Sequence, residues 1–170
     1  MTPIGTVVRG LAGGAIGTAT MAAWQELSTK LKSSGEDRGK GATAASGAAE
    51  PDPWEHASAP AKVGRKILED AFGYEVPPEK IGLLTSVMHW GYGTSWGALY
   101  GLIQRAAPGP AVRSGTLFGA GVWAMSYLTL VPMGIYEPPW KYQPQELALD
   151  LSYHLAYGAG VGAGYGLLDR

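Results

Sequence analysis

The sequence predicts an all-α protein: a four-transmembrane-helix bundle built from two duplicated helical hairpins, with a short amphipathic helix in the first loop. Three observations predict this fold class, namely long windows without charged residues, an internal repeat, and glycines at four-residue spacing. The 13 basic and 14 acidic residues avoid four windows, which are residues 10–25, 81–104, 114–136 and 151–168. A helix needs about 20 mostly apolar residues to cross a bilayer, so these windows predict membrane spans.

The repeat relates residues 89–105 to residues 154–170 at an offset of 65, with nine identical pairs. Each copy has the pattern His-xxx-Gly-xxx-Gly-xxx-Gly. Small residues four apart share one face of a helix and let two helix backbones approach closely. The same spacing occurs near the N-terminus, so the glycines that we expect to pack helices are Gly10, Gly14, Gly93, Gly97, Gly101, Gly158, Gly162 and Gly166.

The composition excludes several classes of protein and site. A formal net charge of −1 leaves no basic surface for nucleic acid. The absence of cysteine excludes disulfides, thiolate metal sites and cysteine nucleophiles. Mean hydropathy is neutral, at −0.01, so a water-soluble bundle is the alternative. Such a bundle needs a charged outer face on each helix, and charge-free runs of 23 or 24 residues do not supply one, which favours the membrane bundle.

The first predicted span covers about residues 4–29, with Trp24 at an interface. No basic stretch precedes it, so we interpret it as a span and not as a cleavable signal peptide. Residues 32–60 are rich in Gly, Ala, Ser and Pro, which predicts a flexible linker. In residues 59–72 apolar and charged side chains follow a helical period, which predicts an amphipathic helix that lies along the membrane surface or caps the bundle.

The remaining predicted spans are residues 81–104, 112–136 and 146–168. A short turn at residues 106–110 makes the second and third spans antiparallel neighbours, and Pro132 is expected to kink or end the third. Four spans place both termini on one side of the membrane. The basic residues of the short connections indicate that this side is cytoplasmic, whereas the larger number of basic residues, in the long first loop, lies on the other side.

The last predicted span carries Glu146, Asp150 and His154 four residues apart, on one face. Of these three, only His154 has a matching residue in the other copy of the repeat, which is His89. Ionisable groups at membrane depth are costly and usually face a bundle interior or a wet cavity. These four residues are therefore the candidate functional polar cluster, and the sequence predicts no catalytic residue and no metal site.

Three interpretations of the histidine pair stay open. A histidine in a glycine-lined interface often only hydrogen-bonds to the neighbouring helix. A carboxylate one turn away can instead fix the tautomer and raise the pKa of a histidine, as a proton relay or a metal ligand requires. Paired histidines at one depth on two helices are also what bis-histidine haem ligation requires. No cofactor is predicted, and haem held by His89 and His154 is the alternative.

Two short segments, Pro132-Met-Gly134 and Pro138-Pro-Trp140, precede Asp150-xxx-His154 on the last predicted helix. Together with His89 ahead of an aromatic and glycine-rich helix, they resemble the YagU-like family of small bacterial inner-membrane proteins. The similarity covers mainly residues 88–158. It implies a polytopic bacterial membrane protein and does not imply a reaction.

The sequence therefore predicts a polytopic integral membrane protein without an identifiable enzymatic activity, most simply an interaction or assembly subunit packed through its glycine stripes. One alternative is a small proton-coupled permeation or transport unit that uses the Asp/His cluster. A second alternative is a haem- or metal-binding membrane subunit. The expected partners are the lipid bilayer and either further copies of the chain or a larger membrane complex.

Overall fold

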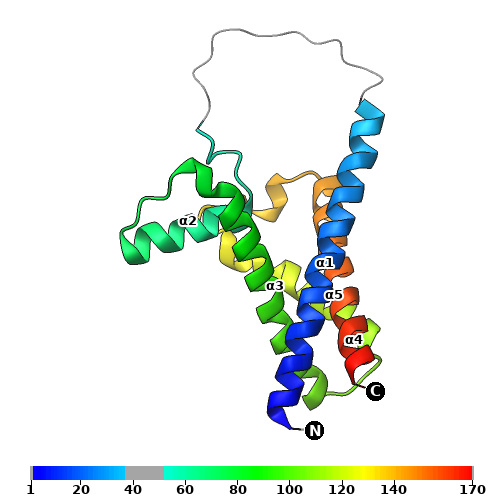
Figure 1. Ribbon diagram of the computed structural model, residues 1–170. Helices are drawn as coiled ribbons and strands as arrows, with labels where there is room; N and C mark the ends of the chain where they lie inside the picture. The colour runs from blue at the N-terminus through cyan, green and yellow to red at the C-terminus, as the bar shows by residue number, and fades with distance from the viewer. Residues whose placement is uncertain (1, 37–51, 170) are drawn as a thin grey trace. The chain divides into compact units, whose positions relative to one another are not determined.

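The computed structural model describes residues 2–36 and 52–169, and within them the chain is all-helical (Figure 1). Two compact units are present, Met1–Trp24 with His89–Arg170, and Gln25–Met88. The helices and 3₁₀ turns of the described residues are α1 (Pro3–Glu36), α2 (Ala59–Phe72), η1 (Pro78–Lys80), α3 (Ile81–Ala106), α4 (Ala111–Leu130), η2 (Pro139–Lys141) and α5 (Pro144–Leu168). Most of the predicted linker, residues 37–51, lies outside the described residues.

In the first unit, α1 and α3 meet at a seam of glycines. A Cβ atom added to Gly10 would lie 2.5 Å from the carbonyl oxygen of Gly97, and one added to Gly14 would lie 2.8 Å from that of Thr94. A Cβ on Gly97 would in turn collide with the backbones of Gly10 and Gly14. The two helices run antiparallel and touch backbone to backbone, which no larger residue allows at these positions.

A second seam of the same kind joins α4 to α5, also antiparallel. A Cβ atom on Gly115 would lie 2.8 Å from the Cα of Gly162, and one on Gly119 would lie 3.0 Å from the Cα of Gly158. Gly115 and Gly119 follow Gly10 and Gly14 by 105 residues, and Gly162 follows Gly97 by 65. Corresponding glycines therefore build corresponding seams in the two halves of the unit.

A third seam joins α1 to α5. It uses the other glycine face of α1, where a Cβ atom on Gly13 would lie 2.9 Å from the carbonyl oxygen of Val161. On α5, a Cβ atom on Gly160 would lie 2.9 Å from the Cα of Gly17. Figure 1 shows α1 beside both α3 and α5 in this unit. Because α1 is antiparallel to each of them, α3 and α5 are parallel to one another.

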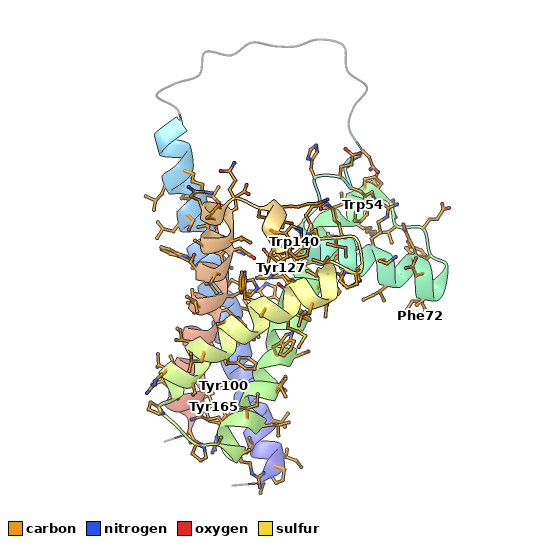
Figure 2. All side chains as sticks on the ribbon, turned by 180° about the vertical axis from the view of Figure 1, so that it is seen from behind. Trp54, Phe72, Tyr100, Tyr127, Trp140 and Tyr165 are labelled. Carbon is orange, nitrogen blue, oxygen red and sulfur yellow. The ribbon has the colours of Figure 1, made fainter. Side chains whose placement is uncertain are left out.

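The register between α3 and α5 equals the offset of the sequence repeat. The rings of Tyr100 and Tyr165 pack edge to face with centroids 5.7 Å apart. Both residues are labelled in Figure 2. The hydroxyl of Tyr157 donates a 2.6 Å hydrogen bond to the carbonyl of Gly93. These contacts join residues 65 and 64 positions apart. The repeat thus places equivalent residues at the same level on two parallel helices.

The core of this unit is rich in aromatic residues, and two of its tyrosines, Tyr157 and Tyr165, border the glycine seams. The buried cluster is Tyr100, Val122, Tyr157, Val161 and Tyr165. A buried tyrosine needs a partner for its hydroxyl. That of Tyr100 lies 2.7 Å from the carbonyl of Ala111 and donates to it.

The α4 helix ends at Leu130, six residues before the end of the predicted span. Gly134 adopts a φ of +70°, a backbone conformation that strongly favours glycine, and the N–H groups of Ile135 and Tyr136 donate to the carbonyl of Leu130. Pro132 follows the last helical residue closely and cannot continue the helix.

The second unit contains a small apolar cluster around α2. Trp54, Ala61 and Val76 are buried in it, and Leu84 of α3 packs against them. The guanidinium of Arg65 lies 4.8 Å from the ring centroid of Trp54, a distance suited to a cation–π interaction. The start of α3 therefore covers part of the apolar face of the amphipathic helix in this unit, while Ile67 and Phe72 are exposed.

No helix within the described residues is both long enough and apolar enough to cross a membrane. The prediction of spans at residues 4–29, 81–104, 112–136 and 146–168 is therefore wrong. The four-transmembrane-helix bundle, the polytopic integral membrane protein and the multi-pass inner-membrane location with cytoplasmic termini are wrong with it. The two alternatives, a transport unit and a haem- or metal-binding membrane subunit, require the same spans. They are therefore wrong as descriptions of a membrane protein.

The error has a physical cause, because a window without charges is not necessarily apolar. Residues 89–97 (His-Trp-Gly-Tyr-Gly-Thr-Ser-Trp-Gly) carry no charge from Lys, Arg, Asp or Glu, yet they contain no aliphatic side chain. Five of the residues between 158 and 166 are glycines. Transfer into hydrocarbon is driven by apolar area, which such residues supply only in small amounts.

Candidate functional site

The carboxylate of Asp150 is the centre of a polar cluster in the first unit. Its Oδ2 atom accepts a 2.9 Å hydrogen bond from the indole N–H of Trp123 and a 3.1 Å hydrogen bond from the hydroxyl of Tyr127. Both donors project from α4, one turn apart, onto the first half of α5. With its side chain 27% exposed, Asp150 is an anion held by two neutral donors at the edge of the helix packing.

His154 lies one turn after Asp150 on α5, and the backbone carbonyl of Asp150 orients its ring. Its Nδ1 atom lies 2.9 Å from the carbonyl oxygen of Asp150 and 3.7 Å from Oδ1 of that carboxylate. A carbonyl oxygen can only accept, so Nδ1 carries the hydrogen. In the neutral imidazole the lone pair then belongs to Nε2. The Asp150 backbone therefore fixes the tautomer of His154, and its carboxylate adds negative charge beside the N–H.

Tyr127 and Tyr136 feel the charge of the carboxylate, and Tyr142 packs against Tyr127. The rings of Tyr136 and Tyr142 pack against Tyr127 at centroid distances of 5.3 and 6.1 Å. Burial and the charge of Asp150 raise the pKa of Tyr127 well above its ordinary range. Burial, followed by the same charge, raises the pKa of Tyr136 to about 12. At neutral pH the hydroxyls of Tyr127 and Tyr136 therefore carry no charge.

His89 lies on α3 at the level of His154, because α3 and α5 are parallel and in register at the repeat offset. Its Nε2 atom is buried, and no described residue offers that atom a hydrogen-bond partner. Burial lowers the pKa of His89 below its ordinary value of 6.5, and the positive charge of protonated His154 lowers it further. The neutral form of His89 is consequently favoured.

Of the four predicted polar residues, Asp150, His154 and His89 lie within about one helical turn of the same level of the bundle. The fourth, Glu146, lies at the start of α5 and has another role. Glu146 is exposed, and its carboxylate accepts a 3.0 Å hydrogen bond from the backbone N–H of Gln143. A carboxylate in the first turn that bonds back to the preceding residue is a helix cap. Glu146 therefore starts α5, and the cluster consists of Asp150, His154 and His89 with their aromatic donors.

The predicted packing glycines lie in the helix seams described above. Three of them, Gly93, Gly101 and Gly166, differ in the atoms that a Cβ would meet. A Cβ atom on Gly93 would collide with the side chain of Thr18, and one on Gly101 would lie 2.7 Å from the carbonyl oxygen of Thr6. Gly166 has more room, because a Cβ there would lie 3.2 Å from the Cβ of Ala111. The last glycine of the second copy thus has the weakest steric reason to be glycine.

Sequence reasoning did not identify Trp123, Tyr127, Tyr136 and Tyr142 as neighbours of Asp150. Trp123 and Tyr127 are four residues apart and so share a helix face, which is a detectable pattern. Nothing local indicates that this face meets a carboxylate more than 20 residues later. That contact depends on how α4 packs on α5.

The arrangement can hold an anion in a hydrogen-bonded position, fix one imidazole in the Nδ1–H tautomer, and keep a second imidazole neutral beside it. Within the described residues there is no group of three or more His, Asp and Glu side chains arranged to hold a metal ion. Comparison of the chain with protein-family models, with curated proteins and with solved structures finds no match.

Proposed function

We propose that this chain is a self-associating helical subunit, in which α4 docks against α4 of a second copy. The observation that carries the proposal is an exposed apolar stripe on α4. Leu117 and Leu128 are 65% and 70% exposed at its ends, and Gly121 and Ala124 are exposed between them. A contiguous exposed apolar patch indicates a surface that another protein covers.

The stripe lies on the side of α4 opposite its internal packing. The buried residues Gly115, Gly119, Val122 and Ser126 repeat at spacings of four, three and four, and the exposed stripe has the same spacings two residues later. Two residues correspond to about 200° around an α-helix. One face of α4 therefore packs on α5, and the opposite face has the same pattern and is exposed among the described residues.

The stripe is complementary to itself. Its four members are placed symmetrically about the point between Val122 and Trp123, with the leucines outside and the small residues inside. Two antiparallel copies of α4 would set Leu117 of each against Leu128 of the other, and Gly121 against Ala124. A twofold interface requires such a self-matching patch. No charged residue lies between Arg113 and Glu137 to oppose this pairing.

Sedimentation velocity of the purified chain and of Gly121→Leu tests the proposal. A Cβ atom at Gly121 would meet nothing within 4 Å, so the leucine fits the folded monomer, and it also raises helix propensity. In a dimer it would separate the two helices at their closest point. We expect the parent chain to sediment at twice its 17.8 kDa mass and Gly121→Leu to sediment at 17.8 kDa.

The matched control is Gly91→Leu, which makes the same change at another exposed helical glycine with nothing within 4 Å. This variant should assemble as the parent chain does. A parent chain that stays at 17.8 kDa as concentration is raised would contradict the proposal, as would a Gly121→Leu variant that assembles normally.

A further inference from the structure

We propose that His89 and His154 form a two-imidazole site for one divalent transition-metal ion of the copper, nickel and zinc class. The site lies between the parallel helices α3 and α5 of the first unit. The pair arises from the register of the two helices, since contacts on its C-terminal side join Tyr100 to Tyr165 and Gly93 to Tyr157. One helical turn earlier, the same register brings the two histidines to one level.

The tautomer of His154 suits a ligand. Its Nδ1–H is committed to the carbonyl of Asp150, which leaves the lone pair of Nε2 for a metal ion. Histidines that bind metals commonly donate their other ring N–H to a carbonyl or carboxylate in this way, and the bond increases their basicity as ligands. Asp150 supplies the carbonyl at 2.9 Å and a carboxylate oxygen at 3.7 Å.

His89 supplies the second, independent observation. Its buried Nε2 has no hydrogen-bond partner among the described residues, and it is the one buried side-chain nitrogen or oxygen there in that condition. Buried polar atoms in proteins are satisfied with few exceptions, so an orphan requires an explanation. A metal ion bound to Nε2 would satisfy it.

The identity of the ion follows from the donor atoms. Imidazole nitrogen suits copper, nickel, zinc and iron, whereas calcium and magnesium require oxygen ligands. The chain has no cysteine, so thiolate does not contribute. The carboxylate of Asp150 is already bound by Trp123 and Tyr127, and it therefore acts from outside the coordination sphere. Water or a small ligand would complete the coordination.

Copper(II) is the sharpest probe, because it binds nitrogen sites most tightly among these ions and its electron paramagnetic resonance spectrum reports coordinated nitrogen. The experiment uses the full chain without a histidine tag, titrated with CuCl2 alone. We expect one tightly bound copper per chain with hyperfine structure from two imidazole nitrogens. His89→Ala and His154→Ala should each weaken binding by at least about tenfold and remove one nitrogen from the spectrum.

The third histidine of the chain, His56, is exposed and provides the matched control. His56→Ala should bind copper with unchanged affinity and spectrum. Asp150→Asn keeps an oxygen acceptor for Trp123 and removes the charge, so it should weaken binding without changing the number of coordinated nitrogens. Circular dichroism of each variant separates loss of a ligand from loss of the fold.

The proposal is overturned if folded His89→Ala and His154→Ala bind copper as the parent chain does, or if the parent chain shows no stoichiometric binding. Loss of binding in His56→Ala would also overturn it, since the ion would then occupy a surface site. Gly121→Leu should bind copper normally, so this result does not depend on whether the chain self-associates.

Discussion

The indole N–H of Trp123 donates a 2.9 Å hydrogen bond to Oδ2 of Asp150, joining the middle of α4 to the first half of α5. The same oxygen accepts from Tyr127, so the carboxylate depends on α4 for both of its neutral donors. This contact lies beyond the glycine seam of the two helices. It is therefore a second, polar attachment between them, and it can be removed without disturbing the seam.

Trp123→Phe should destabilise the protein by about 1.5–3 kcal/mol, the range for hydrogen bonds to charged groups. The phenyl ring keeps most of the packing and leaves the carboxylate with one donor fewer. The unfolding midpoint in urea at constant slope measures the change. Trp140, which is 82% exposed, provides the control, since Trp140→Phe should change stability by less than about 0.5 kcal/mol. Equal effects of the two changes would mean that the Asp150 bond contributes little.

Gly97→Ala should destabilise the protein by about 1–3 kcal/mol or more, because the new Cβ collides with the backbones of Gly10 and Gly14. Neither backbone can move without opening the seam between α1 and α3. Gly91→Ala, in the same helix but facing open space, should have the opposite sign and stabilise by up to about 1 kcal/mol. Thermal or urea unfolding measures both. A neutral Gly97→Ala would show that the seam is looser than its contacts indicate.

The stability of the protein should fall as pH drops below about 6.5, in part because of His89. Its folded-state pKa is lowered from 6.5, by burial first and by His154 second. Above pH 6.5 both states carry a neutral ring. Below it the unfolded chain binds a proton that the folded chain resists, so the free energy of unfolding decreases. His89→Leu removes this contribution and should flatten the dependence between about pH 7 and pH 5.

Urea unfolding at each pH measures that slope. His56→Leu is the control, since His56 is exposed and the slope of this variant should match the parent chain. If His89→Leu and the parent chain lost stability in parallel on acidification, His89 would not be the group responsible.

Tyr157→Phe should cost about 0.5–1.5 kcal/mol, the usual contribution of a neutral hydrogen bond. Its hydroxyl is the donor that ties α5 to the carbonyl of Gly93 on α3. Tyr92, which is 47% exposed, gives the comparison, and Tyr92→Phe should have a smaller effect. Unfolding midpoints show which of the two variants loses more stability. A larger loss in Tyr92→Phe than in Tyr157→Phe would argue against the Tyr157 bond as a link between the helices.

The helical class of this chain could be predicted because its causes are local. Prolines and glycines interrupt the sequence between residues 106 and 110 and between 132 and 144. The helix α3 ends at the first interruption, α4 lies between the two, and α5 begins at the end of the second. The membrane spans could not be inferred correctly from the same stretches. These stretches lack charge without being strongly apolar, because they are rich in glycine, serine, threonine and aromatic residues.

The sequence by itself determined which residues are small, four apart and repeated at an offset of 65. These are properties of one helix at a time. Only the tertiary structure decided which helices meet, placing Gly97 against Gly10 and Gly14, and Gly162 against Gly115. It also decided that Asp150 meets Trp123 and that Glu146 merely caps its own helix. A glycine stripe allows the backbone of another helix to approach closely. Which helix approaches is determined by the packing of all the helices together.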